Sequence, residues 1–403
     1  MDIDDTPEEA AFRAEARAWL DRNALPKGHP DDFSLGLWSG AYDEATYIAR
    51  CRAWQHTLHA AGWAGITWPR EHGGRGGKPI EQVIFNQEQS RYGVSTGAFM
   101  ISIGMAGPTI LRHGSPEQKA RFLAPMIAAD EIWCQLFSEP DAGSDLANLA
   151  TRAERDGDEW VVNGQKVWTS SPDRARYGML LARTDFGARK HAGISYFLLD
   201  MSTPGIEVRP LRQMTGEADF NEVFLENVRV PRDSIVGERG RGWQVSRSTL
   251  KHERALIGSP TFARRTFDGI VMMAQAIEIR GRRAIDDPVF RNRLVEIEGR
   301  LLAAEYNSLR LLTASARGED PGLAALVPKL HSSTLAYDVA RLAMDMMSDR
   351  GCLYPGEPNA PAMGLFGRAY MWYFGMAIGG GAPNIQRNVI GERGLGLPRD
   401  ARR

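Results

Sequence analysis

The sequence is poor in cysteine, with only Cys51, Cys134 and Cys352 among its 403 residues. Their wide spacing matches neither a disulfide framework nor a metal motif, so no metal site is expected and a reducing cytoplasm is the predicted location. Uninterrupted apolar runs of about 18 residues are also lacking, so no membrane-spanning helix is expected. The acidic N-terminal stretch, residues 1–19, has no apolar core and does not predict a signal peptide.

An excess of charge of one sign is lacking as well, because 49 Lys and Arg balance 50 Asp and Glu. A surface that binds nucleic acid needs a clustered basic excess to neutralise phosphates, so no nucleic-acid partner is expected. Arginines are abundant over residues 264–293, but Asp and Glu interleave with them, which favours a solvated helical face over a binding patch. The composition, 43% hydrophobic and 25% charged, is that of a globular protein with room for two or three domains.

The hydrophobic period changes twice along the chain and predicts three domains, in a fold that is mostly α with a central β domain. Residues 1–130 have helical spacing, residues 131–240 have short β-branched segments between turn residues, and helical spacing returns over 241–403. The predicted N-terminal helices are 7–23, 47–61, 81–92, 95–111 and 116–128. The predicted strands are 133–137, 147–154, 159–170, 177–183, 194–200, 206–210 and 221–230. The helices of a predicted C-terminal four-helix bundle are 243–282, 288–316, 323–349 and 362–378.

The most informative part of the chain begins with a predicted strand over 133–137 and the loop SEPDAGSD at 138–145. Such a loop exposes hydroxyls and backbone N–H groups together, as recognition of a phosphate or a flavin edge requires. In the next segment, Asn163-Gly164 predicts a two-residue hairpin turn. Alternation along a strand places Trp168 and Ser170 on one face. The two segments in this order, about 25 residues apart, form a more specific signal than either one alone.

These two segments resemble the flavin-binding segments of the acyl-CoA dehydrogenases. Further motifs extend the resemblance over nearly the whole chain: GWAGITWPREHGG at 62–74, GPT at 107–109, HGSPEQK at 113–119, FLENVRVP at 224–231, IQRN at 385–388 and GLGLPR at 394–399. The resemblance implies the family's fold with a β-barrel-like middle domain, and FAD as the cofactor. It also implies an acyl-CoA substrate, electron-transfer flavoprotein as the electron acceptor, and assembly into a homotetramer or a heterotetramer.

The resemblance further implies α,β-dehydrogenation of an acyl-CoA thioester to the trans-2-enoyl-CoA, in which a carboxylate removes the α proton and the β hydride passes to the flavin. Many members carry this carboxylate as a Glu on a C-terminal loop, where this chain has Gly380. Isovaleryl- and long-chain-type members place it in a Glu-Arg pair on the first long C-terminal helix, which Glu253-Arg254 matches. We therefore expect Glu253 to be the base and the Gly380 N–H to bind the thioester carbonyl. The alternative for Glu253 is a solvated side chain in an i, i+4 ion pair.

The remaining site residues are also assigned by the resemblance. The residues expected to meet the flavin are Gln135, Phe137, Ser138, Gly143, Ser144, Trp168, Thr169, Ser170 and Arg280. The residues expected to meet the pantetheine and CoA are Ser144, Lys251 and Arg254. An apolar wall of the acyl pocket is expected from Phe99, Met100, Ile103 and Met105, whose shape, and hence acyl preference, the sequence does not define.

The contacts expected for the ADP half of the flavin depart from the family's pattern. The departing residues are Asp345, Ser348 and Asp349, where Gln and Gly-Gly are frequent, and Ala382 and Pro383, where Thr-Ser is frequent. In the family these contacts are largely made across a dimer interface, and Arg280, Arg282 and Arg283 are all candidates for the adenine contact. Acidic side chains beside a pyrophosphate are unfavourable unless a cation such as Arg350 compensates.

Three interpretations remain open at the level of the sequence. The first is an active homotetrameric acyl-CoA dehydrogenase that uses Glu253. The second is one subunit of a hetero-oligomeric enzyme, as occurs among bacterial steroid-degrading members, and the altered ADP contacts favour it. The third is a repurposed flavoprotein that acts on a non-CoA substrate, and the retention of Glu253, Arg254, Trp168 and Ser170 argues against it.

Overall fold

The structure, a computed structural model, describes residues 5–36, 42–354 and 356–398. The chain forms two compact units that divide between Glu253 and Arg254. Residues 1–4 of the acidic N-terminal stretch lie outside the described residues, as does Arg399, the last residue of the GLGLPR motif. In the described part of the chain, no helix has both the length and the apolar content needed to cross a bilayer.

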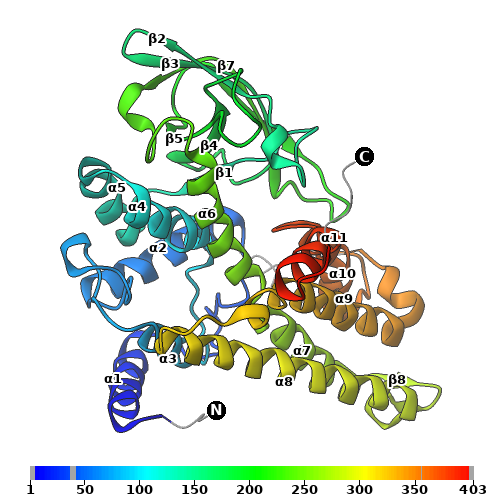
Figure 1. The fold of residues 1–403 in the computed structure, drawn as a ribbon. Helices are drawn as coiled ribbons and strands as arrows, with labels where there is room; N and C mark the ends of the chain where they lie inside the picture. The colour runs from blue at the N-terminus through cyan, green and yellow to red at the C-terminus, as the bar shows by residue number, and fades with distance from the viewer. Residues whose placement is uncertain (1–4, 37–41, 355, 399–403) are drawn as a thin grey trace. The chain divides into compact units, whose positions relative to one another are not determined.

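The first unit begins with α-helices (Figure 1), as the period of the first 130 residues predicts: α1 (Pro7–Asn23), α2 (Glu44–Ala60), α3 (Pro79–Gln89), α4 (Gly107–His113) and α5 (Pro116–Ala128). A capping box between Thr6 and Glu9 starts α1, as the sequence predicts. The buried carboxylate of Glu88 in α3 lies 3.0 Å from the guanidinium of Arg13 and 2.8 Å from that of Arg17. These ion pairs hold α1 against α3.

The single buried helix predicted over 95–111 is wrong. The segment forms a 3₁₀ turn at Gly97–Phe99 and a π-helical turn at Ser102–Ala106 before α4 begins. Pro108 has no N–H to donate to a preceding carbonyl, and Gly104 and Gly107 shortly before it have low helix propensity, so a regular α-helix does not run through the segment.

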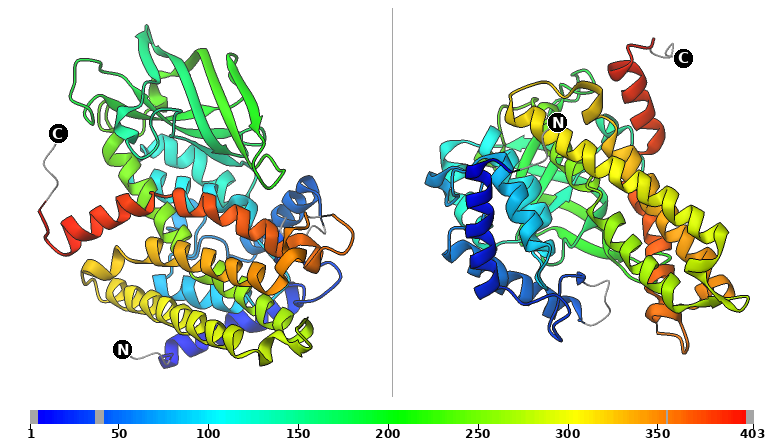
Figure 2. Two further views of the ribbon diagram at one scale, coloured as in Figure 1. Left: turned by 90° about the vertical axis from the view of Figure 1, so that its right-hand side faces the viewer. Right: turned by 90° about the horizontal axis from the view of Figure 1, so that it is seen from below.

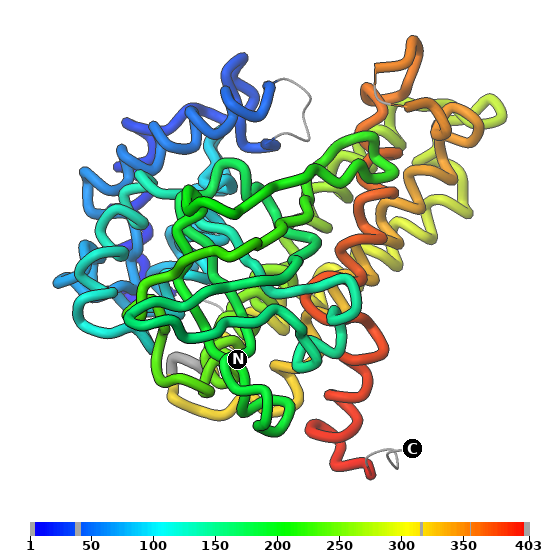
Figure 3. The backbone as a smooth tube through the Cα atoms, turned by 90° about the horizontal axis from the view of Figure 1, so that it is seen from above, coloured from blue at the N-terminus to red at the C-terminus, as the bar shows by residue number. Residues whose placement is uncertain are grey.

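The rest of the first unit is built around a curled, seven-stranded sheet, counted over the described residues. Its strands are β1 (Trp133–Leu136), β2 (Arg152–Asp156), β3 (Glu159–Ser170), β4 (Tyr177–Arg183), β5 (Ile194–Asp200), β6 (Ile206–Leu211) and β7 (Phe220–Pro231). The order is β1-β4-β2-β3-β7-β6, with β5 paired to β4, and Figure 3 shows these strands as neighbouring green segments. β1 pairs with β4 in parallel, whereas β3 pairs with both β2 and β7 in antiparallel fashion. The predicted β-barrel-like middle domain is confirmed.

The hairpin turn predicted at Asn163-Gly164 is wrong, because both residues lie inside β3. The hairpin between β2 and β3 instead turns at Gly157-Asp158, where Gly157 has a φ of 61°. The Asn163 side chain accepts a hydrogen bond from the Asn227 N–H (2.8 Å), and a Cβ at Gly164 would lie 2.8 Å from the Thr151 Cα. Asn163 and Gly164 therefore allow β3 to lie close to Asn227 and Thr151, and they do not reverse the chain.

The strand predicted over 147–154 starts later than expected. Residues Leu146–Asn148 form a 3₁₀ turn, and β2 begins at Arg152. The reason is local: the N–H groups of Ala150 and Thr151 donate to the carboxylate of Glu139 at 2.6 and 3.0 Å. Backbone groups bound to a side chain are not available to a strand ladder.

Two irregularities shift the register between β3 and β7 and then restore it. Val162 pairs with Val228, but two residues later Gly164 pairs with Leu225, so the extra residue is on β7. Farther along, the extra residue is on β3, at the position of Trp168, which has a φ of 61°. Each irregularity is a β-bulge, and bulges re-aim side chains next to binding sites in many sheets.

The second unit is helical, as predicted. Its helices are α7 (Thr261–Ala276), α8 (Pro288–Ala316), α9 (Pro328–Met347), α10 (Leu365–Ile378) and α11 (Pro383–Val389). α9 packs against α7, α8 and α10, and both views of Figure 2 show α8 and α9 side by side.

The helix predicted over 243–282 is divided. α6 (Gly242–Ile257), which contains both Glu253 and Arg254, ends before Pro260, and α7 starts directly after this proline. Pro260 cannot donate the hydrogen bond that a continuous helix needs. Beyond α7, the short strands β8 (Glu278–Ile279) and β9 (Arg282–Arg283) form a small hairpin that the sequence did not predict.

Candidate functional site

The two segments predicted to bind the flavin are joined by hydrogen bonds. The Val167 N–H donates to the Ser138 carbonyl (2.9 Å), and the Lys166 ammonium donates to the Phe137 carbonyl (3.1 Å). The Phe137 ring is buried against Tyr196, with ring centroids 5.8 Å apart, so it belongs to the core. The structure therefore brings the end of β1 next to the bulge of β3, as the predicted site requires.

A buried ion pair fixes this junction. Lys166 is fully buried, and its Nζ lies 2.7 Å from the Glu139 carboxylate. Burial lowers the pKa of Lys166 to about 8, although Glu139 opposes the shift. Burial acts to raise the pKa of Glu139, but Lys166, Thr151 and Ala150 outweigh burial and hold this pKa below its ordinary value. Both side chains are therefore charged at neutral pH. Sequence reasoning missed this pair, because the two residues are 27 positions apart in the chain.

Trp168 is exposed and has an unusual backbone conformation. Its side chain is 60% exposed and its φ is positive, a conformation that costs free energy in a non-glycine residue. The next residue, Thr169, is fully buried with no hydrogen-bond partner for its hydroxyl, and Ser170 is partly exposed again. Trp168 and Ser170 thus share the accessible side of β3, as alternation predicts.

The SEPDAGSD loop turns tightly and presents its far end to solvent. Glu139 and Ala142 exchange two backbone hydrogen bonds, which closes the turn at Pro140. Gly143 and Ser144 follow, both exposed, and no atom lies within 4 Å of a Cβ built on Gly143. Open backbone next to a hydroxyl suits contact with an extended ligand.

Glu253, the predicted base, is held beside β1. The Gln135 side chain donates a hydrogen bond from Nε2 to Glu253 Oε2 at 3.2 Å, and both residues are half-buried. Gln135 precedes the Phe137–Ser138 segment by two residues, so the carboxylate lies next to the strand that leads into the predicted flavin segment. The bond joins residues 118 positions apart in the chain.

Hydroxyl groups hold α6 one turn before Glu253. Thr249 is buried, and its hydroxyl lies 3.0 Å from that of Thr109 in α4 and 3.2 Å from that of Tyr196 in β5. Burial raises the pKa of Tyr196, so its hydroxyl stays protonated and can donate. Lys251, predicted to meet CoA, lies exposed on the same helix.

The predicted acyl wall is only partly buried. Phe99 and Met105 are buried and Ile103 is half-buried, whereas Met100 is 46% exposed. Met100 is therefore not a wall of an enclosed pocket within the first unit.

The second unit contains Gly380 in a tight turn. Gly380 has a φ of 64°, a conformation that a glutamate would adopt only with strain. The buried Lys329 side chain donates to the carbonyls of Ala377 (2.8 Å) and Gly381 (2.7 Å), and Gln386 donates to that of Gly380 (3.3 Å). The backbone at this turn is thus fixed by side chains of its own unit.

The residues predicted near the flavin's ADP half are spread over the second unit. Arg280 lies exposed at the tip of the β8–β9 hairpin, with a φ of 53°. Asp345 pairs with Arg293 (2.7 Å), and the guanidinium of Arg350 donates to the Asn359 carbonyl (3.4 Å). Ala382 and Pro383 form the N-terminal start of α11.

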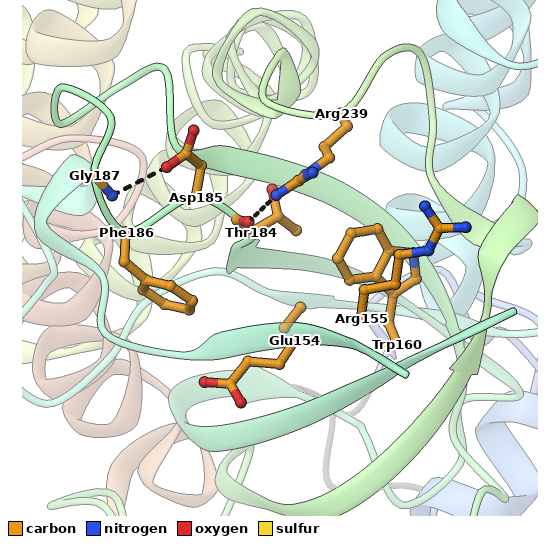
Figure 4. Close-up of a pocket in the computed structure, with 9 residues that line it drawn as sticks. Glu154, Arg155, Trp160, Thr184, Asp185, Phe186, Gly187 and Arg239 are labelled. Carbon is orange, nitrogen blue, oxygen red and sulfur yellow. Dashed lines mark hydrogen bonds between the residues drawn. The ribbon is translucent and has the colours of Figure 1, made fainter. Parts of the chain in front are cut away.

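A surface cavity of about 410 Å³ in the first unit lies among residues that were not predicted as site residues (Figure 4). Its lining includes Trp160, Phe186 and Arg239. The Arg239 guanidinium donates to the Thr184 carbonyl (2.6 Å) and lies over the Trp160 ring, while Asp185 accepts from the Gly187 N–H (3.0 Å). Arg239 and Asp185 already have partners among residues 184–187. These contacts stabilise the local structure of that segment.

Models of three acyl-CoA dehydrogenase domains match the chain in order: the N-terminal domain at residues 6–130, the middle domain at 134–228 and the C-terminal domain at 240–395. Acyl-CoA dehydrogenase IpdE1 of Mycobacterium tuberculosis is 39% identical over 97% of this chain and 98% of its own length. Among solved structures, the Tcur3481-Tcur3483 steroid ACAD has a TM-score of 0.82 at 29% identity, and the ChsE4-ChsE5 complex from Mycobacterium tuberculosis has a TM-score of 0.81 at 31% identity. Each similarity covers 99% of this chain and 100% of the other.

The fold, the hydrogen bond that joins the Ser138 and Val167 segments, and the three domain matches along the chain all indicate the same family. The chain belongs to the acyl-CoA dehydrogenase family and is an oxidoreductase of that type.

Proposed function

We propose that the chain removes the α proton of an acyl-CoA with the carboxylate of Glu253, as the first half of an α,β-dehydrogenation. The observation that carries this proposal is the hydrogen bond from Gln135 to Glu253, because it holds a carboxylate beside the strand that leads into Phe137 and Ser138. A general base must be placed before its basicity matters. The position of Gly380, at a φ that disfavours a glutamate, supports the helix rather than the loop as the source of the base.

The family binds FAD, and we propose that this chain holds FAD with the segments around Ser138 and Trp168. An exposed indole on a strained backbone fits a planar ligand that supplies contacts from outside the chain. Gly143 and Ser144 offer an accessible backbone for the ligand's polar part. When bound, FAD supplies acceptance of the β hydride.

The chain's own contribution to the reaction is positional and acid–base. Glu253 takes the α proton and becomes a carboxylic acid, while the electron pair of the α C–H bond becomes the second bond between the α and β carbons. The Gly380 N–H, a prediction from the resemblance, would stabilise negative charge on the thioester oxygen.

Replacing Trp168 by alanine is expected to weaken flavin retention, because the exposed indole is the largest apolar surface offered to the ring. The measurement is the flavin-to-protein absorbance ratio after dialysis. Phe186→Ala, which removes another exposed aromatic side chain of the same unit, is the matched control and should leave the ratio unchanged. Equal flavin content in wild type and Trp168→Ala would place the flavin elsewhere.

We further propose that the acyl group is a steroid side chain and that the chain works with a second, different subunit. The support comes from relatives: one similar structure is named a steroid ACAD, and another is a complex of two differently named chains. The altered residues at Asp345 and Ala382-Pro383 are consistent with a chain that does not complete the ADP half by itself. Electron-transfer flavoprotein is the proposed electron acceptor.

Purification of the chain alone tests the two-subunit proposal. We expect clearly less than one flavin per chain, and bleaching by a steroid carrying a short acyl-CoA side chain only after a partner subunit is added. One flavin per chain, with bleaching by butanoyl- or octanoyl-CoA, would instead support a homotetramer. Failure of every acyl-CoA with a fully flavin-loaded protein would contradict the acyl-CoA substrate.

A further inference from the structure

Gln135 is an unusual residue in its strand. The other residues of β1, Trp133, Cys134 and Leu136, are buried, and only Gln135 is partly exposed. A mostly buried strand of this kind gains stability from apolar side chains, so packing alone does not explain an amide at this position. The Gln135 amide instead points to Glu253, with 3.2 Å between Nε2 and Oε2.

We infer that Gln135 is a positioning residue for Glu253, whose amide holds the carboxylate in the orientation that takes the α proton. The inference rests on the proposed role of Glu253 as the base. An ionised carboxylate can only accept hydrogen bonds, so the amide must donate through Nε2. The resemblance assigns Gln135 to the flavin alone, and this second role belongs to its side chain.

One set of contacts holds the helix backbone near Glu253, and another holds the Glu253 carboxylate. The helix backbone is fixed one turn earlier, where Thr249 meets Thr109 and Tyr196. Residues four apart lie on one face of a helix, so fixing Thr249 also fixes the direction in which Glu253 leaves α6. The side-chain torsions of Glu253 still rotate, and a contact near the carboxylate, such as the bond from Gln135, restricts them.

The hydrogen bond has two opposing consequences for proton removal. It orients the carboxylate, which speeds the reaction, and it stabilises the ionised form, which makes the carboxylate a weaker base. A misplacement of about 1 Å can cost roughly 100-fold in rate, so we expect orientation to dominate. A fall in the bleaching rate when the amide is removed would therefore support the inference, and a rise would contradict it.

The test replaces Gln135 by methionine, which keeps the length of the side chain and removes the donor. Flavin-loaded protein, with its partner subunit if one is needed, is mixed rapidly with the acyl-CoA that bleaches the wild type fastest. We expect the limiting bleaching rate, measured per bound flavin, to fall about 10- to 100-fold, with the half-saturating acyl-CoA concentration unchanged. The isotope effect from an α-deuterated acyl-CoA should rise, because proton removal becomes a larger part of the barrier.

The matched control is Gln165→Met, because Gln165 makes the same kind of bond to Glu222 (2.9 Å) elsewhere in the sheet. Gln165→Met should bleach at the wild-type rate. In a Glu253→Gln background, Gln135→Met should have no further effect, since it has no base to position.

Several results would overturn the inference. They are an unchanged or faster rate in Gln135→Met, an equal loss in Gln165→Met, or a crystal structure of the flavin-loaded protein in which Gln135 Nε2 lies beyond hydrogen-bond distance of Glu253. Normal bleaching by Glu253→Gln would remove the proposed base itself, and Gln135 would then have nothing to position. Loss of bleaching in Glu253→Gln together with a wild-type rate in Gln135→Met would overturn only the inference about Gln135.

Discussion

Glu253→Gln is expected to reduce the rate of flavin bleaching by acyl-CoA by roughly 10²–10⁴-fold, the usual contribution of a general base. The substitution keeps the shape of the side chain and its capacity to meet Gln135, but it removes the basic carboxylate. Flavin content should remain at the wild-type value, because the predicted flavin contacts at Ser138 and Trp168 are unaltered. The measurement is the first-order rate of absorbance loss after rapid anaerobic mixing.

Glu222→Gln is the control for this experiment, since Glu222 also pairs with a glutamine side chain and lies on β7 rather than α6. It should bleach at the wild-type rate. A near wild-type rate in Glu253→Gln would exclude Glu253 as the base. Absence of bleaching in the wild type as well would point to a missing partner subunit or to another class of substrate.

Lys166→Met is expected to lower the free energy of unfolding of the first unit by about 3–5 kcal/mol, because it leaves the buried Glu139 carboxylate without its cation. At about 2–4 °C of melting temperature per kcal/mol, the loss corresponds to roughly 10 °C. Since Lys166 also donates to the Phe137 carbonyl, flavin retention should weaken in parallel. Thermal unfolding followed by circular dichroism, with and without added FAD, measures both effects.

Two further variants compare the contribution of the buried Lys166–Glu139 ion pair to stability with that of an exposed ion pair. Lys190→Met removes an exposed ion pair with Asp145, and exposed pairs contribute only about 0.2–1 kcal/mol. The double variant Lys166→Met/Glu139→Gln should recover part of the stability lost in Lys166→Met, because no uncompensated charge remains buried. A melting temperature of Lys166→Met within about 2 °C of the wild type would contradict the role of the pair.

The sequence was most predictive where local signals and family motifs coincide. The helix start at Thr6 follows from side-chain capping of neighbouring residues, and the placement of Glu253 on a helix follows from its motif. The hairpin turn at Asn163-Gly164 failed because the same dipeptide also suits a site where two strands approach closely. Which of the two structures forms depends on Thr151 and Asn227, and neither is a sequence neighbour of Gly164.

The buried pair of Lys166 and Glu139 was beyond sequence reasoning for a related reason. The two residues are 27 positions apart, and only the packing of β3 against the segment after β1 brings them together. The bond between Gln135 and Glu253 depends in the same way on how α6 is held against the sheet by Thr249. Long-range packing, rather than any local preference, therefore defines the details of the site.

The opposite bulges of β3 and β7 have a consequence for how the chain can change in length during evolution. From Val162 to Thr169, and from Asn221 to Val228, the two strands advance by the same seven residues although their pairing slides in between. A single deletion at Asn227 would remove the bulge of β7 but leave the bulge of β3. The pairing of the two strands would then stay shifted by one residue, and each following side chain of β7 would turn to the opposite face. Gaps in this part of related sequences should therefore occur in pairs, one in each strand, or not at all.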